Sequence, residues 1–145
     1  MAKKKKARQQ VLSLRHKNIM QTKALFDMVN RFALDERIVG NLLSNEQLKA
    51  LAIAATEFYA GYAMLSQAQS STDISIDTII TLSELALIKR LFLLYIERET
   101  ALQLEASRGL GVDVFGRSVS EVISEINLYE AELPRLAFFA DISTV

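Results

Sequence analysis

Backbone breakers are scarce in this chain of 145 residues, and their scarcity limits the folds that it can adopt. The only proline is Pro134, and the five glycines are Gly40, Gly61, Gly109, Gly111 and Gly116. Because proline and glycine punctuate helices more strongly than other residues, long uninterrupted helices are expected between them. Half of the residues are hydrophobic, which is enough for an independent core at this length. We therefore predict an all-α protein with four main helices.

The first two helices are placed by apolar periodicity and by a capping pattern. The first is expected from residue 8 or 18 to residue 34, because apolar residues recur every seven positions at Leu12, Ile19, Phe26 and Ala33, with Val29 in the same stripe. The second is expected over residues 44–68, where an S-x-x-Q capping box can form between Ser44 and Gln47 and a hydrophobic staple between Leu43 and Leu48. Its expected core stripe is Leu48, Leu51, Ala55, Phe58, Tyr62 and Leu65, which leaves Tyr59 as a candidate for an interface.

A long central helix is expected over residues 76–107, ending at Gly109. Its first turn is ambiguous, because residues 74–80 also alternate like a strand. Residues 79–96 are apolar nearly all round but contain Glu84, Lys89 and Arg90, and central charges oppose membrane insertion. A helix of this kind is expected to be buried on several faces, with other subunits of an oligomer covering part of it.

The fourth helix is expected to begin at Ser118, which forms an S-x-x-E capping box with Glu121. Val119, Val122, Ile126, Tyr129 and Leu133 follow a heptad, and Pro134 is expected to stop or kink the helix. With the glycine turn over residues 109–117, the third and fourth helices would form a hairpin, and the apolar tail over residues 136–145 would pack on this chain or another. The candidate subunit interface is Leu91, Tyr95, Leu102, Val122, Ile126 and Tyr129.

Positive and negative charges are separated along the chain. Residues 1–17 carry seven basic residues and no acidic one, whereas residues 18–145 carry ten basic and seventeen acidic residues. This division predicts a flexible basic arm over residues 1–17 and a single helical domain over residues 18–145. A basic arm is typical of proteins that bind nucleic acid, an anionic membrane or an acidic protein surface. The candidate phosphate contacts are Lys3, Lys4, Lys5, Lys6, Arg8, Arg15 and Lys17.

The usual catalytic and metal-binding sets are missing from the sequence. There is no cysteine, and the only histidine, His16, lies in the basic arm, which excludes thiolate sites, HExxH zinc sites and triads that need a histidine in the body. Gly109-x-Gly111 lacks the remaining letters of a dinucleotide or P-loop motif. Neighbouring carboxylates such as Glu97 and Glu99 do not share a helix face. We therefore expect no enzyme activity, no cofactor and no metal site.

Two stretches carry a resemblance. Residues 42–52 combine a short apolar lead, a capped start and an alanine-rich helix, and the long helix, the glycine turn and the heptad from Val119 to Leu133 follow later in the chain. Both stretches resemble the small terminase subunits of tailed phages, the DNA-recognition component of the packaging motor. The resemblance implies a ring-shaped oligomer, viral DNA as ligand, a large ATPase subunit as partner, and no catalysis by the chain itself.

The expected function is therefore a non-catalytic, oligomeric nucleic-acid-binding protein, with lysine and arginine contacting phosphates without reading bases. Viral DNA recognition for genome packaging is the specific form of this hypothesis. One alternative is a structural or adaptor component of a phage particle that docks on a protein through its apolar tail. Another is a small inhibitor whose acidic surface occupies a nucleic-acid-binding enzyme. A basic start without a following apolar segment predicts no secretory leader, no membrane association and a cytoplasmic location.

Overall fold

The computed structural model describes residues 22–37, 40–66, 74–111 and 116–138, and these residues are mostly helical with one small sheet. The basic arm, with Leu12 and Ile19 of the first expected stripe, lies outside the described residues, as do residues 67–73 and residues 139–145 of the tail. The described elements, in chain order, are strand β1 (Thr22–Ala24), helix α2 (Leu25–Arg31), the π-helical turn η1 (Phe32–Glu36), helix α3 (Asn45–Ala60), strand β2 (Ile79–Thr81), helix α4 (Leu82–Arg108) and helix α5 (Val119–Ala137).

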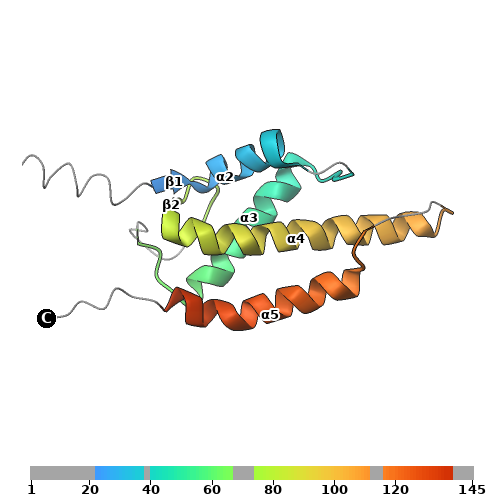
Figure 1. Cartoon of the computed structure of the whole chain (residues 1–145). Coiled ribbons are helices and arrows are strands. Elements are labelled where there is room, and N and C mark those ends of the chain that lie inside the picture. The colour runs from blue at the N-terminus through green and yellow to red at the C-terminus, as the bar shows by residue number, and fades with distance from the viewer. Residues whose placement is uncertain (1–21, 38–39, 67–73, 112–115, 139–145) are drawn as a thin grey trace, which may run out of the picture.

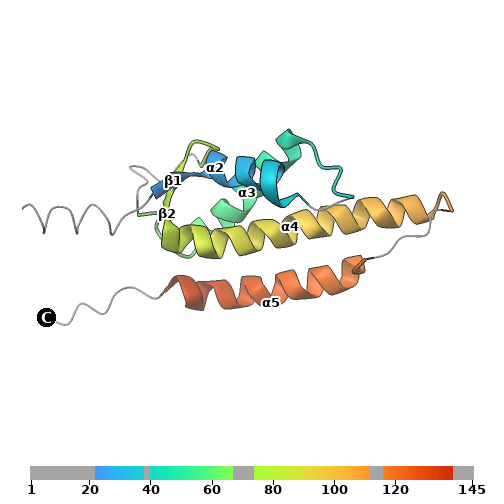
Figure 2. The ribbon, with the colours of Figure 1, turned by 45° about the horizontal axis from the view of Figure 1, so that its top comes forward.

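Helix α4 lies in the middle of the structure. Helices α2 and α3 cover one side of it and α5 runs antiparallel along another side, as Figures 1 and 2 show. Phe92 of α4 is the largest of the fully buried side chains, and its ring meets that of Phe32 edge to face with 5.7 Å between ring centroids. Ile88, Leu91 and Ile96 of α4 are buried as well. The chain alone therefore buries much of the apolar stretch over residues 79–96, without a second subunit.

The two short strands replace helix where the sequence predicts it. β1 pairs antiparallel with β2, with Thr22 opposite Thr81 and Ala24 opposite Ile79. The long helix therefore begins at Leu82 rather than at residue 76, so its expected start is wrong. The first expected helix is interrupted by β1 and resumes as α2 at Leu25, while its expected start at residue 8 or 18 lies outside the described residues. The alternation noted over residues 74–80 is the strand pattern, and its middle residue, Ile80, is fully buried. The pairing joins segments more than fifty residues apart, which periodicity within either segment does not reveal.

Helix α3 begins as predicted and ends earlier. The Ser44 hydroxyl accepts a hydrogen bond from the Gln47 backbone N–H, and the Gln47 side chain accepts one from the Ser44 N–H. The helix ends at Ala60 rather than near residue 68. The chain turns at Gly61, Leu65 is buried, and Ser66 reaches Glu84 of α4. This anchorage on another helix explains the early end.

Two of the expected core stripes differ from the observed ones. In α2, Val29 of the expected stripe is buried, but Phe26 is 40% exposed, and Leu25 and Met28 are buried in its place. In α3, the observed buried positions are Leu48, Ala52, Ala55, Thr56 and Tyr59. Tyr59, expected at an interface, is only 6% exposed, whereas Tyr62, expected in the core, is 52% exposed. In both helices the buried face is shifted around the helix axis from the expected face, because the neighbouring elements pack on a different side of the helix.

Helix α5 begins as predicted but does not end at its proline. α5 begins with the predicted capping box between Ser118 and Glu121, and Val122, Ile126, Tyr129 and Leu133 are buried as its heptad predicts. The helix does not stop at Pro134 but continues to Ala137. A proline in the last turn removes a single backbone donor, while its carbonyl still accepts from the Phe138 N–H at 3.1 Å.

The end of α4 is close to the predicted one. The helix ends at Arg108, one residue before Gly109. The backbone becomes left-handed two residues later, at Gly111, where φ is +80°. Among the described helices, none combines the length and the apolar character needed to cross a membrane.

Candidate functional site

The predicted phosphate contacts lie outside the described residues. Lys3, Lys4, Lys5, Lys6, Arg8, Arg15 and Lys17 all fall within residues 1–21, for which the structure gives no placement. Their role in nucleic-acid binding stays a prediction from the sequence.

Five of the six residues predicted at a subunit interface are instead packed within this chain. Leu91, Val122, Ile126 and Tyr129 are at most 4% exposed, and Tyr95 is 8% exposed. The two tyrosines are also fixed by hydrogen bonds. The Tyr95 hydroxyl donates to Glu130 Oε1 at 2.6 Å, and the Tyr129 hydroxyl donates to the Leu87 carbonyl at 2.9 Å. These side chains hold α4 and α5 together, so in this fold they offer almost no surface to another copy.

The sixth residue, Leu102, is 44% exposed near the C-terminal end of α4. It is the only member of the predicted set with surface available for a partner in this structure. Formation of an oligomer stays a prediction, and its surface has to be sought among side chains that the fold leaves open.

A shallow groove follows one flank of the α4–α5 pair. We call it the α4–α5 groove. The lining residues are Ala86, Lys89, Arg90, Leu93, Leu94 and Glu97 from α4, and Glu125, Leu128, Tyr129, Ala131, Glu132 and Arg135 from α5. The groove combines charged groups of both signs with apolar side chains. Leu128, at 73% exposed, is a large apolar side chain that the groove leaves open to solvent.

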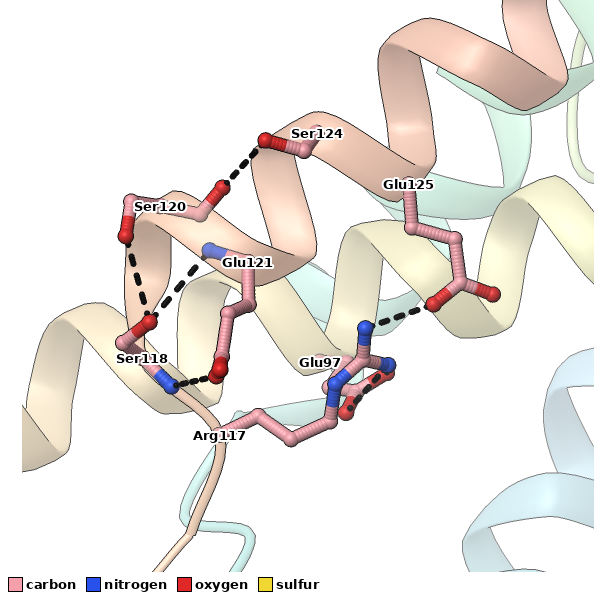
Figure 3. A network of polar contacts seen from close by, with 7 residues as sticks. All are labelled: Glu97, Arg117, Ser118, Ser120, Glu121, Ser124 and Glu125. Atoms are coloured by element: carbon pink, nitrogen blue, oxygen red, sulfur yellow. Dashed lines mark hydrogen bonds and ion pairs between the residues drawn. The ribbon is translucent and has the colours of Figure 1, made fainter.

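An arginine closes one end of the α4–α5 groove. Arg117, the last residue of the expected glycine turn, lies between Glu97 and Glu125 in Figure 3. Its Nη1 atom is 3.2 Å from both carboxylate oxygens of Glu97, and its Nη2 atom is 2.6 Å from Glu125 Oε2. The hydrogen bond to Glu125 raises the pKa of the Arg117 guanidinium. The two carboxylates thereby connect the start of α5 to the middle of α4.

Arg90 occupies the centre of the groove and has a different environment. Its guanidinium carbon lies 4.7 Å from the centroid of the Tyr129 ring, a cation–π contact. Among the residues that the structure describes, no carboxylate lies within ion-pair distance of Arg90. Burial raises the pKa of the Tyr129 hydroxyl, while the Arg90 charge acts to lower it. The exposed guanidinium of Arg90 is therefore open to an anionic group.

A buried carboxylate, which the sequence analysis did not single out, lies at the start of α4. Glu84 is 3% exposed. Its Oε1 atom accepts hydrogen bonds from the Ser66 backbone N–H at 2.7 Å and the Ser66 hydroxyl at 2.8 Å. Its Oε2 atom accepts from the Thr81 N–H at 2.7 Å. Burial acts to raise the pKa of Glu84, but these hydrogen bonds bring it below its usual value. The T-x-x-E capping pattern was the available sequence signal.

Most other carboxylates near α4 also have structural partners. Glu36 pairs with Lys89 at 2.7 Å, and Glu99 pairs with Arg98 at 3.0 Å. Within the described ranges, no three acidic or histidine side chains are grouped closely enough to hold a metal ion. The charged side chains of the body are therefore arranged for packing, capping and surface recognition.

Comparisons of the chain with protein families, with curated proteins and with solved structures find no match.

Proposed function

We propose that this chain is a non-catalytic, oligomeric helical protein that binds nucleic acid through its basic N-terminal arm. The observation that carries the proposal is the separation of charge, with seven basic residues and no acidic residue in residues 1–17. Clustered lysine and arginine side chains bind phosphates and release condensed counterions, so binding is favoured at low salt. Recognition of viral DNA during genome packaging is the specific form of the proposal, and it rests on the resemblance to small terminase subunits.

The helical body supports a binding role through the way it uses its charges. Glu84 fixes the loop after α3, and Glu97 and Glu125 hold the start of α5 through Arg117. These carboxylates are committed to structural contacts, and none is paired with a second carboxylate as an acid and base would be. The body therefore serves best as a rigid support for a nucleic-acid contact made by the basic residues elsewhere in the chain.

Deletion of residues 2–8 tests the proposal, because it removes five basic residues and leaves the described helices untouched. We expect weaker duplex binding and a smaller dependence of log K on log salt, by up to about 4 units of slope if all five cations contact phosphates. Fluorescence anisotropy with a labelled duplex measures both quantities. Arg31→Gln, an exposed cation on α2, is the matched control. Unchanged affinity and slope after the deletion would contradict the proposal.

A second candidate is a structural or adaptor protein that docks on another protein. The exposed apolar side chains favour it, since Leu128 is 73% exposed and Phe138, at the start of the apolar tail, is 82% exposed. In that case the chain would keep its assembly state and show no binding to nucleic acid even at low salt. The same titration separates the two candidates.

A further inference from the structure

The open stripe of α4 in the α4–α5 groove has its charges arranged about an apolar centre. Arg90 and Glu97 both line the groove, seven residues apart and therefore on the same face of the helix. Leu93 lies between them, one turn from each. The positive and negative groups thus lie on opposite sides of a leucine that is only partly buried against the core.

Both charged groups have capacity for another partner. Arg90 is exposed, and among the described residues its side-chain interaction is the cation–π contact with Tyr129, without an ion pair to the carboxylates of Glu125 and Glu132 that line the same groove. Glu97 accepts from Arg117, but at 3.2 Å to each oxygen, and its side chain is 39% exposed. Carboxylate oxygens accept more than one hydrogen bond each, so Glu97 can take a second guanidinium.

This arrangement is self-complementary under a two-fold rotation. When two copies of α4 pack antiparallel about Leu93, Arg90 of each copy lies beside Glu97 of the other, and the leucines meet at the centre. In such an isologous contact, the pair of Arg90 and Glu97 occurs twice. A parallel, in-register contact would instead place Arg90 beside Arg90 and be repulsive.

We propose that a second copy of this chain occupies the α4–α5 groove, forming an antiparallel two-fold dimer through α4. Leu128, exposed on the α5 side of the groove, adds apolar area to the contact. Charge complementarity selects the second copy as the occupant, because the groove presents both the guanidinium and the carboxylate that the contact needs. The proposal specifies an oligomer of two chains, which departs from the ring that the resemblance to small terminase subunits implies. It rests only on the oligomeric part of the proposed function.

A charge-swap mixture tests the dimer directly. In the Arg90→Glu chain alone, two carboxylates face each other at both contacts, and in the Glu97→Arg chain alone, two guanidinium groups do. Each variant is expected to be a monomer. In an equal mixture of the two variants, both contacts pair opposite charges again, so a mixed dimer is expected. Light scattering after size exclusion, without nucleic acid, measures the mass against the 16.2 kDa of one chain.

The controls separate folding from association. Arg31→Glu, on the exposed surface of α2, reverses a charge outside the groove and is expected to leave the dimer intact. Circular dichroism of each groove variant checks its fold. Recovery of the dimer on mixing shows independently that both variants are folded. Deletion of residues 2–8 should leave the number of chains per particle unchanged, so failure of nucleic-acid binding and failure of the dimer are distinguishable.

Several results would overturn the proposal. These are a wild-type chain that stays monomeric at high concentration, a particle larger than a dimer, variants that dimerise alone, and a mixture that remains monomeric. Dimerisation of the wild-type chain with loss in both variants and recovery in the mixture is the expected result.

Discussion

Removal of the Glu84 carboxylate should cost more stability than removal of any exposed acidic group in this chain. Glu84 accepts three hydrogen bonds at 2.7–2.8 Å, two of them from the backbone N–H groups of Ser66 and Thr81. Hydrogen bonds to charged groups contribute about 1.5–3 kcal/mol each, and an unsatisfied buried donor costs about 1–3 kcal/mol. Because water can reach the Ser66 donors after truncation, we expect Glu84→Ala to lower the free energy of unfolding by about 3 kcal/mol.

A second variant separates the charge from the shape of the side chain. In Glu84→Gln, the amide has one oxygen, so it can accept from Ser66 or from Thr81 but faces the other donor with an N–H. We expect a smaller loss of about 1–2 kcal/mol. Urea unfolding measures both values, and an unchanged m-value shows that the folded and unfolded states keep their compactness. Glu57→Ala, at an exposed position of α3, is the matched control.

The effect should also depend on pH. The pKa of Glu84 in the folded chain lies below its ordinary value of 4.5. A lowered pKa gives stability that is present above the unfolded value and is lost as the pH falls through the folded value. The stability difference between the wild-type chain and Glu84→Gln should therefore be constant near neutral pH and shrink below pH 4.5. A Glu84→Ala chain no less stable than Glu57→Ala would refute the reasoning.

Two further substitutions test the contact between α4 and α5 and the start of α5. Tyr129→Phe removes the hydroxyl that donates to the half-buried Leu87 carbonyl, and we expect a loss of about 1 kcal/mol in urea unfolding, against almost none for Tyr62→Phe. Ser118→Ala removes the N-cap of α5 and should cost about 1 kcal/mol. An unchanged urea midpoint in either chain would contradict the assigned contact.

Local chemistry in the sequence was sufficient to predict the helix starts that depend on caps. The capping boxes at Ser44 and Ser118 each involve residues within one turn, and both occur in the structure. The heptad of α5 was also predictable, because α5 packs mainly along one long neighbour, α4. Such features need no knowledge of distant segments.

Features that join distant segments could not be predicted in this way. The pairing of β1 with β2 and the early end of α3, fixed by Ser66 on Glu84, depend on where the chain returns in space. The same limit affects the candidate interface. Tyr95 and Tyr129 are apolar enough to suggest a subunit contact, but the sequence cannot show that α5 and other elements of the same chain already cover them. The open charges of the α4–α5 groove became visible only once the covered side chains were known.

The most direct test of the central claim is the mass of the full chain with and without duplex DNA, at low and at moderate salt. Size exclusion with light scattering measures it in one experiment. The account predicts an oligomer that gains mass with duplex at low salt and releases it as the salt concentration rises. A particle whose mass is the same with and without duplex at low salt would contradict nucleic-acid binding and favour a protein partner.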